Sequence, residues 1–155
     1  MKTAKEMVEE KGGEIVCVPM GTTVFEALQK MCRRKVGAIL VLRDDDVAGI
    51  WTERDLLIHI VNADFDPKTA LIENYMTTDL FFARHDETLY NLMDKFLGLR
   101  IRHLPVSENG EFIGLLSSGD VMKAAISAKN TELEKLNDMV SWEYYENWRW
   151  DPKNS

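Results

Sequence analysis

Residues 49–55 read GIWTERD, and residues 114–120 read GLLSSGD. Each stretch has a glycine, two hydrophobic residues, a hydroxyl residue and, three positions further, an aspartate. The two stretches are 65 residues apart, and the same offset aligns Thr23 with Thr88 and Lys30 with Lys95. No gap is needed from residues 15 and 80 to residues 61 and 126. A gapless match over this length indicates an internal duplication.

The duplicated segments also share their hydrophobic periodicity. Apolar residues recur at i, i+3, i+4 and i+7 in residues 24–31 and again in residues 89–96, which is typical of an amphipathic helix. Two apolar runs and a turn follow in each copy, and Asn109-Gly110 in the second turn favours a β-hairpin. The predicted strands are 15–18, 38–42, 47–51, 80–83, 103–106 and 112–116, and the predicted helices are 24–34, 53–61, 89–97 and 119–127.

This order, β-α-β-β-α twice, predicts an α+β fold. One such unit is too small for a good core, so we expect the two repeats to pack together as a pseudo-twofold pair. The expected divisions are an N-terminal segment (1–14), the first repeat (15–66), a linker (67–77), the second repeat (78–128) and a C-terminal helix with an aromatic tail (129–155). The linker is expected to contain a short helix at 69–75. The last helix is expected over residues 131–140.

Composition narrows the function classes. The chain has 155 residues, 45% of them hydrophobic, and a net charge of −7, which disfavours nonspecific binding to nucleic acids or to anionic membranes. Cys17 and Cys32 form no CxxC pair, residues 1–11 are too charged for a signal peptide, and no apolar run approaches ~18 residues. We therefore expect a cytoplasmic protein with reduced thiols and no nucleic-acid or membrane partner.

The motifs Thr52-x-x-Asp55 and Ser117-x-x-Asp120 have two interpretations. As capping boxes, each hydroxyl accepts a bond from an N–H of the first helical turn, and each carboxylate reaches back. As nucleotide sites, each carboxylate accepts hydrogen bonds from a ribose, and the helix N-terminus attracts phosphate. In the second interpretation Gly49 or Gly114 lets a ring approach the backbone closely. The two interpretations are compatible, and the repetition of the motif favours binding.

Other candidate sites have little support. His59, His85 and His103 are dispersed without the spacing of zinc ligands, and residues 44–46 (DDD) fit a solvated turn. Nothing resembles an activated nucleophile, so we expect no enzyme and no obligatory cofactor. Strand alternation favours a core or interface position for Trp51, with stacking on adenine as the minority alternative. His59 is expected at the surface or rim of a helix.

The repeat resembles a tandem pair of cystathionine-β-synthase-type (CBS) domains. The residues that carry the resemblance are the two stretches quoted first, together with VCVP (16–19), VGAILV (36–41) and RHLPV (102–106). It covers roughly residues 8–127 and is greatest with stand-alone bacterial CBS-pair proteins. It implies a regulatory module that binds AMP, ADP, ATP, S-adenosylmethionine or NAD in clefts between the paired repeats, with AMP expected first.

The resemblance also implies site residues. Asp55 and Asp120 would hold ribose, and Thr52 and Ser117 would bond ribose or phosphate. Phosphate would also meet the nearby basic residues Arg54, Lys35, Arg102 and His103. For His103, a structural hydrogen bond is an equal alternative. The adenine slot would be lined by Val16, Cys17, Val18, Val47, Ala48, Phe81, Phe82, Ala83, Phe112 and Ile113. The second repeat lacks a cation before its aspartate, so each site is expected to draw its cation from the other repeat.

Three functions remain in competition. The first is an adenine-nucleotide sensor that passes a conformational change to another protein, and the resemblance implies a homodimer. The second is a ligand-free dimerisation or scaffold module, and the third, which is disfavoured, is a small enzyme. The aromatic tail fits contacts with its own repeats or across a dimer first, then a regulated protein partner, then a cover over a cleft. The aromatic residues of this tail are Trp142, Tyr144, Tyr145, Trp148 and Trp150.

Overall fold

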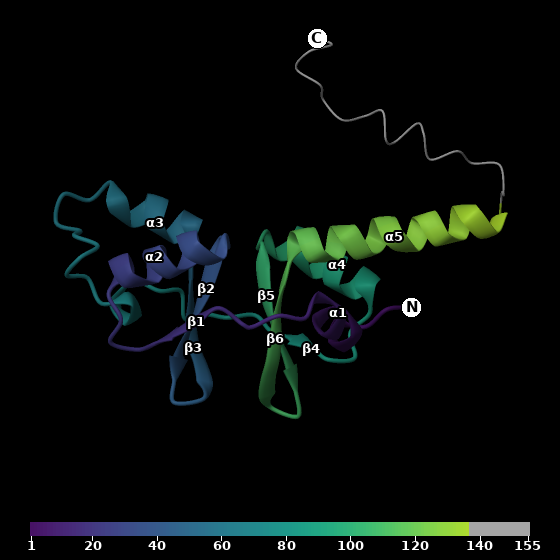
Figure 1. Cartoon of the computed structure of the whole chain (residues 1–155), viewed down its shortest axis with the longest axis horizontal. Coiled ribbons are helices and arrows are strands. Elements are labelled where there is room, and N and C mark those ends of the chain that lie inside the picture. The colour runs from purple at the N-terminus through teal and green to yellow at the C-terminus, as the bar shows by residue number, and fades with distance from the viewer. Residues whose placement is uncertain (137–155) are drawn as a thin grey trace, which may run out of the picture.

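The structure is a computed structural model that describes residues 1–136, and it contains two three-stranded sheets (Figure 1). The expected β-α-β-β-α order is confirmed in both repeats. The first repeat comprises β1 (Cys17–Pro19), α2 (Val24–Arg34), β2 (Ala38–Arg43), β3 (Asp46–Thr52) and α3 (Glu53–Ile60). The second comprises β4 (Ala83–Arg84), α4 (Leu89–Leu99), β5 (His103–Glu108), β6 (Glu111–Ser117) and α5 (Ser118–Leu136).

The two sheets have the same topology and the same irregularities. In each, a short first strand pairs in parallel with the next strand, which then pairs antiparallel with the third. The ladder shifts register after Val41 in one sheet and after Val106 in the other, 65 residues later. The hairpin turns place Asp44 and Asn109 in the left-handed region, again 65 residues apart. The duplication therefore extends to details of the backbone.

One pair of equivalent lysines shows how each helix is fixed to its sheet. Lys30 of α2 donates to the carbonyl of Cys17 at 2.7 Å, and Lys95 of α4 donates to the carbonyl of Phe82 at 3.1 Å. The Cys17 carbonyl belongs to β1, and the Phe82 carbonyl directly precedes β4. Each lysine therefore connects its helix to the first strand of its repeat. The alignment of these lysines in the sequence thus reflects a shared contact.

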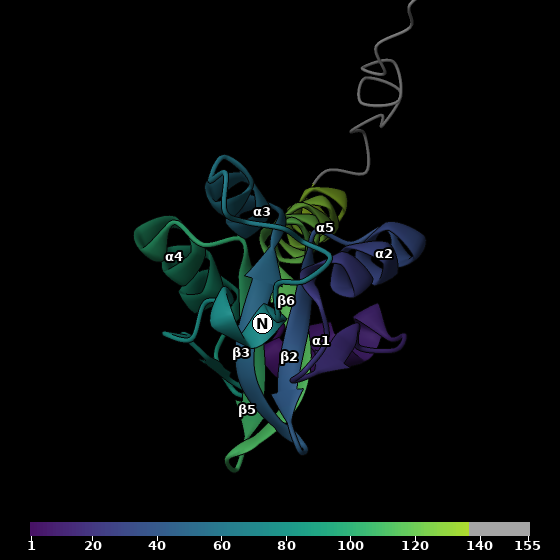
Figure 2. The ribbon, with the colours of Figure 1, turned by 90° about the vertical axis from the view of Figure 1, so that its left-hand side faces the viewer.

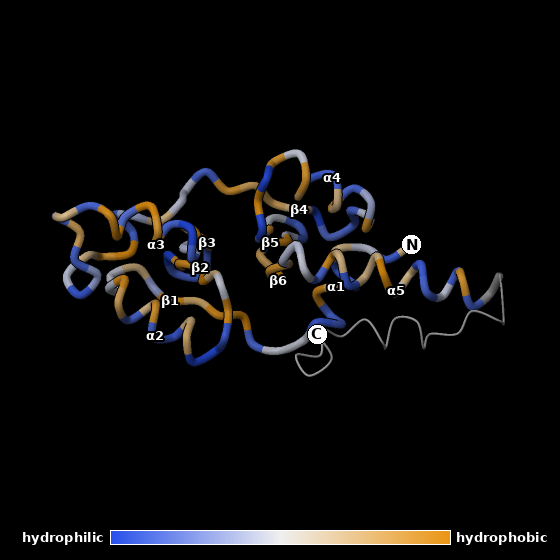
Figure 3. The backbone as a smooth tube through the Cα atoms, turned by 90° about the horizontal axis from the view of Figure 1, so that it is seen from above, coloured by the Kyte–Doolittle hydropathy of each residue, from blue (hydrophilic) through white to orange (hydrophobic). Residues whose placement is uncertain are grey.

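Each repeat has its own hydrophobic core, and a third cluster joins the sheets. Ala38, Leu40 and Ile50 of the first repeat form this third cluster, with Phe112 and Leu115 of the second packed against it. Figure 3 shows hydrophobic segments where β1 and β6 lie. Figures 1 and 2 place both hairpin turns at one end of the molecule and α3 and α5 at the other. The pseudo-twofold packing expected from the sequence is therefore present.

Trp51 lies in the core of the first repeat, as strand alternation predicted. Its side chain is 0% exposed, and its ring stacks on His59 with centroids 5.9 Å apart. His59 also packs against Phe65 and Tyr75, so it lies at the rim of this aromatic cluster, in line with the expected surface or rim position. The imidazole is half-buried because α3 closes over this aromatic cluster.

The N-terminal segment contains a helix that the sequence analysis did not predict. Helix α1 (Ala4–Lys11) begins with a capping box between Thr3 and Glu6 and packs on the second repeat. The Ala4 N–H donates to the carbonyl of Glu87, and Met7 lies in the core of the second repeat. A helix that precedes the first repeat therefore completes the second one.

The linker makes the reciprocal contact with the first repeat. Its regular structure is a 3-10 turn, η1 (Ile72–Asn74), where the sequence predicted a helix over 69–75. The Ile72 N–H donates to the carbonyl of Thr22, and the Val24 N–H donates to the carbonyl of Ala70. Because these backbone groups pair with the first repeat, they are not available for a helix. The N-terminal segment (1–14) and the linker (67–77) thus each pack on the other repeat, and we call them the crossed segments.

The last described helix also differs from expectation. Helix α5 runs without a break from Ser118 to Leu136, where two helices, 119–127 and 131–140, were expected. No glycine or proline interrupts residues 120–136, so nothing in the sequence stops the helix between them. The predicted aromatic tail lies outside the described residues. Within residues 1–136, no helix has both the length and the hydrophobicity needed to cross a membrane.

Candidate functional site

A cleft of about 460 Å³ opens where α1, the first repeat and the second repeat meet. This volume falls within the range of small-molecule sites, ~300–1,000 Å³. We call it the inter-repeat cleft. It is lined by Val8, Glu9 and residues 11–16 from the N-terminal segment and the entrance to β1, by residues 35–38 before and within β2, and by His103, residues 113–115 and Ser117 from β5 and β6.

The last lining residue along the chain is Ser117, which ends β6 directly before α5 and is hydrogen-bonded to Asp120 in the first turn of that helix. The Ser117 N–H donates to Oδ2 of Asp120 at 2.7 Å, and the Asp120 N–H donates to Oγ of Ser117 at 3.1 Å. This is the reciprocal geometry of a capping box, which holds the carboxylate over the first turn of the helix. None of the hydrogen bonds among residues 1–134 ends on Oδ1 of Asp120, so this oxygen can accept from a ligand.

Lys11, the last residue of α1, makes an ion pair with the same carboxylate. Its Nζ lies 2.8 Å from Oδ2 of Asp120 and 3.1 Å from the carbonyl oxygen of Leu115. Burial on its own raises the pKa of Asp120, but the bonds from Lys11 and Ser117 outweigh it, so the pKa lies below its ordinary value. Asp120 is therefore ionised at neutral pH.

The cleft contains three basic side chains of unequal character. Lys35 caps α2 in the left-handed conformation, with φ of 55°, and is exposed. His103 lies beside Ser117 across the β5–β6 ladder. Burial first, and the charge of Lys11 second, lower the pKa of His103, so the imidazole is uncharged at neutral pH. Lys11 and Lys35 are therefore the permanent cations on this cleft, and Glu9 and Glu14 are its acidic side chains.

The equivalent aspartate of the first repeat has different partners. Oδ2 of Asp55 accepts from the Thr52 N–H at 3.0 Å, which again is capping-box geometry. Oδ1 accepts from the hydroxyl of Thr77 at 3.2 Å. Thr77 belongs to the linker, just as Lys11 belongs to the N-terminal segment. Each aspartate is thus bonded by the segment that crosses to its repeat, but one donor is neutral and the other is charged.

The glycines of the two motifs have a packing role. A Cβ added at Gly49 would overlap the side chain of Met76, and a Cβ added at Gly114 would overlap Val8. The place of a side chain at both glycines is filled by the crossed segments, while Gly114 also lines the inter-repeat cleft, so the approach of a ligand ring there stays a prediction. The glycines are needed because the N-terminal segment and the linker pass directly over β6 and β3.

The structure brings five of the sequence-predicted residues together on the inter-repeat cleft: Val16, Lys35, His103, Ile113 and Ser117. Lys35 comes from the first repeat and Ser117 from the second, and that a ligand draws its cation from the other repeat stays a prediction. Val18 and Ala83 do not line an open slot, because they lie in the two hydrophobic cores beside Val41 and Val106.

The remaining predicted residues lie elsewhere on the molecule. Cys17, Val47 and Phe112 pack on the cluster between the sheets. Phe81 and Phe82 are exposed, as are Arg54 and Arg102, and Ala48 is half-buried. Lys11 is the basic cleft residue that sequence reasoning missed. No signal in the repeat could identify it, because it precedes the first repeat and the 65-residue offset aligns it with Met76.

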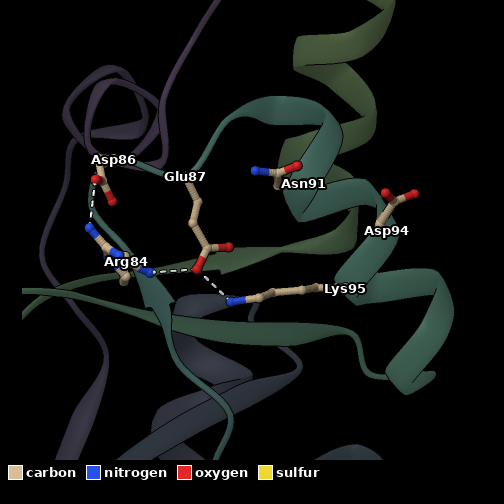
Figure 4. Close-up of a pocket in the computed structure, with 6 residues that line it drawn as sticks. All are labelled: Arg84, Asp86, Glu87, Asn91, Asp94 and Lys95. Carbon is tan, nitrogen blue, oxygen red and sulfur yellow. Dashed lines mark hydrogen bonds and ion pairs between the residues drawn. The ribbon is translucent and has the colours of Figure 1, made fainter.

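A second hollow lies at the start of α4 and is lined by polar and charged residues (Figure 4). Figure 4 shows Glu87 between Arg84 and Lys95: its Oε1 accepts from the Arg84 N–H at 3.1 Å and from Lys95 Nζ at 2.5 Å. The Arg84 guanidinium pairs with Asp86 at 2.8 Å. Both basic side chains are bonded to carboxylates, and Asp94 leaves this hollow with one more acidic than basic side chain. Within the described part of the chain, no three side chains of metal-ligating type gather into one group.

Comparisons with known proteins agree with this architecture. A family model described as the CBS domain matches residues 7–62 and again residues 72–127. The CBS domain-containing protein CBSCBSPB3 of Arabidopsis thaliana is 33% identical over 119 residues, which cover 76% of this chain. The matched part is 21% of that protein, so the chain spans about a fifth of that relative's length.

Solved structures have the same fold. The crystal structure of a CBS-domain containing protein from Agrobacterium tumefaciens superposes with a TM-score of 0.75 at 34% identity, covering 80% of this chain and 99% of that one. The crystal structure of CBSX2 in complex with AMP superposes with a TM-score of 0.68 at 25% identity, covering 82% of this chain and 98% of that one.

Proposed function

Because this chain belongs to the CBS-domain family, we propose that it is a regulatory module that binds an adenine nucleotide between its repeats. The observation that supports the proposal most directly is the inter-repeat cleft, which opens beside Asp120 and draws its lining from both repeats. AMP is the ligand that we expect, since CBSX2 forms a complex with AMP. ADP, ATP, NAD and S-adenosylmethionine are the related compounds to compare with it.

The proposed roles follow from the chemistry of the lining. Asp120 accepts hydrogen bonds from ribose, for which Oδ1 is available, and Ser117 bonds ribose or phosphate. The N-terminus of α5, a helix of 19 residues, favours negative charge, so phosphate is expected near it and near Lys35 and His103. The adenine ring packs against apolar side chains at the cleft, of which Val16 and Ile113 come from opposite repeats.

A second, weaker site is proposed around Asp55 and Thr52. Its cations would be Arg54 and Arg102, and the exposed rings of Phe81 and Phe82 would offer an apolar surface for adenine. Because Thr77 already bonds Oδ1 of Asp55, ribose has to replace that hydrogen bond there. We therefore expect the site at Asp55 to bind less tightly than the inter-repeat cleft.

Binding between the repeats provides a route to regulation. A ligand shifts a conformational equilibrium only by its differential affinity for the two states. A nucleotide that contacts Val16 of the first repeat and Ser117 of the second binds one relative placement of the repeats better than another. The crossed segments would carry the change outward, because α1 precedes the first repeat but contacts the second, and the linker precedes the second repeat but contacts the first. A regulated protein partner at the aromatic tail, residues 142–150, completes this proposal.

The surface near α3 and α5 supports a homodimer. Val61, just after α3, is 80% exposed, and its equivalent in α5, Ile126, is 56% exposed. Leu57 and Met122 form a second exposed pair at the same offset. Both helices lie on the side opposite the hairpin turns (Figures 1 and 2). A face that repeats itself about a pseudo-twofold axis suits a second copy of the same chain, because a dimer interface is self-complementary.

One observation favours a ligand-free assembly module instead. Both aspartates are used in capping boxes, so a structural role accounts for the positions of Thr52, Asp55, Ser117 and Asp120 without a ligand. The chain offers a matched comparison, because Thr23 and Glu26 form the same capping box at the start of α2. Glu26→Ala removes a cap of this kind outside the inter-repeat cleft.

The two functions are separated by thermal unfolding in the presence of the five adenosine compounds. For a nucleotide sensor, ligand at 100 times its dissociation constant adds about 2.7 kcal/mol to the free energy of unfolding, or roughly 5–11 °C for a two-state domain of this size. Asp120→Ala and Glu26→Ala should each lower the melting temperature of the protein alone, but Asp120→Ala should also reduce the shift caused by AMP. Unchanged melting temperatures with every compound would support the assembly module.

A further inference from the structure

We propose that Lys11 makes the inter-repeat cleft selective for phosphorylated ligands, by exchanging between the carboxylate of Asp120 and the phosphate of a bound adenine nucleotide. The inference rests on the proposed function and adds to it a specificity-determining residue outside the repeat motifs. The motifs account for the recognition of adenine and ribose, which AMP and adenosine share. Lys11 would account for the distinction between them.

The position of Lys11 is the first observation. Its Nζ bonds Oδ2 of Asp120 and the carbonyl of Leu115, and the residue itself lines the cleft. Gly12 and Gly13, which follow it, also line the cleft and both have positive φ, at 56° and 80°. An ammonium group carries three donors on a flexible stem, so Lys11 can turn to a new acceptor without a movement of α1.

Competition for Asp120 is the second observation. Oδ2 already accepts from the Ser117 N–H and from Lys11, whereas Oδ1 accepts no hydrogen bond from residues 1–134. A ribose that donates both hydroxyls to a carboxylate needs two acceptor positions. One hydroxyl can use Oδ1, but the other has to share Oδ2 and therefore competes with Lys11. Ribose binding thus weakens the ion pair.

The charge balance then decides which ligands bind well. The side chains of Lys11 and Asp120 are 44% and 29% exposed, so their ion pair is partly shielded from water. With adenosine, the ammonium group loses its anionic partner and gains none. With AMP, it forms a new charge-assisted hydrogen bond to phosphate, and such bonds are stronger than neutral ones. His103 does not replace this charge at neutral pH, because burial and the neighbouring Lys11 lower its pKa.

The other aspartate provides an internal contrast. Asp55 receives its linker hydrogen bond from the hydroxyl of Thr77, which carries no charge. Displacing Thr77 leaves no cation without a partner. The exchange proposed for Lys11 therefore has no equivalent at Asp55, and the preference for phosphate should belong to the inter-repeat cleft.

Calorimetric titrations of AMP and adenosine test the inference. Asp55→Ala is introduced in every protein, so that binding is confined to the inter-repeat cleft. To this background we add Lys11→Met, Lys11→Arg or, as a control, Lys2→Met, which removes a lysine that pairs with Glu10 on the same segment and does not line the cleft. Far-ultraviolet circular dichroism and thermal unfolding verify that each variant is folded.

The measured quantity is the ratio of the AMP and adenosine affinities. Lys11→Met should reduce this ratio about tenfold, as the loss of one charge-assisted hydrogen bond implies, with adenosine binding at least as tightly as before. Lys11→Arg and Lys2→Met should keep the ratio of the background protein. An unchanged ratio in Lys11→Met, with AMP still bound, would overturn the inference and leave the proposed function intact. Failure of the wild-type protein to bind either compound would overturn both.

A second measurement needs no substitution. Acetic anhydride acetylates exposed lysines, and mass spectrometry reports the rate at each position. Relative to Lys2, Lys11 should be acetylated more slowly with AMP than with adenosine, because phosphate holds its ammonium group. Equal relative rates with the two saturating compounds would contradict the proposed exchange, even if Lys11→Met failed to fold.

Discussion

Val8 of α1 occupies the place that a side chain at residue 114 would take, so that α1 lies directly against the backbone of β6 at Gly114. The relationship recurs between Met76 and Gly49 in the other repeat. Glycine is therefore required at both positions by the crossed segments, and the crossing is part of the fold of each repeat.

Gly114→Ala should destabilise the protein. The added methyl group overlaps the β-branched side chain of Val8, which has little freedom to move, so the strain should lower the free energy of unfolding by about 1–3 kcal/mol. Chemical denaturation measures this change. Gly98→Ala is the matched control, because a Cβ at residue 98 of α4 meets nothing within 4 Å. That substitution should stabilise the helix by about 0.5–1 kcal/mol. Equal effects of the two substitutions would contradict the role given to Gly114.

His103 should make stability depend on pH. Burial first, then Lys11 and Arg102, lower its pKa from the ordinary value of 6.5, although Asp120 and Glu53 act in the opposite direction. Below pH 6.5 the unfolded chain therefore binds a proton that the folded chain does not yet bind. Protonation then favours unfolding, and the free energy of unfolding falls as the pH falls from 7 towards the pKa of the folded state.

The comparison of wild type with His103→Gln isolates this contribution. Denaturation at a series of pH values between 7 and 5 should give a shallower loss of stability in the variant. Asp120 adds little in this window, because its pKa lies below its ordinary value of 3.8 and it remains ionised in the folded and unfolded states. Parallel curves for the two proteins would contradict the assignment to His103.

The dimer face can be tested on both of its helices. Val61→Glu and Met122→Glu place a charge on the proposed interface and should convert the dimer to a monomer, as measured by light scattering after size-exclusion chromatography. Leu97→Glu, at an exposed position of α4, is the matched control and should leave the mass unchanged. A chain that ends at Val140 should also stay dimeric. Dimers of unchanged mass in both interface variants would exclude this face.

Most of the fold could be predicted because the sequence repeats itself in phase with its helices. Helix α2 begins and ends at the predicted residues, and the hairpin strands differ from prediction by one or two residues. The motif aspartates were placed correctly at the first turns of α3 and α5, since a hydroxyl residue followed three positions later by an acid is a local signal.

The features that depend on contacts distant in the sequence could not be predicted. Helix α1 is short, and the residues that hold it, such as Glu87 and Gly114, lie far along the chain. Nothing in the sequence around Lys11 indicates that this residue pairs with Asp120, which lies 109 residues further along the chain. The burial of Val18, which was expected in the adenine slot, could not be predicted for a related reason, because alternation gives two faces but does not say which one meets the core.

The central claim is tested most directly by titrating AMP into wild type, Asp55→Ala, Asp120→Ala and the double variant, with Glu26→Ala as the control for a lost capping box. We predict that each single variant loses binding at its own site, that the double variant binds no AMP, and that Glu26→Ala binds AMP as wild type does. Wild-type affinity in a folded double variant would contradict the assignment of ribose to these two carboxylates.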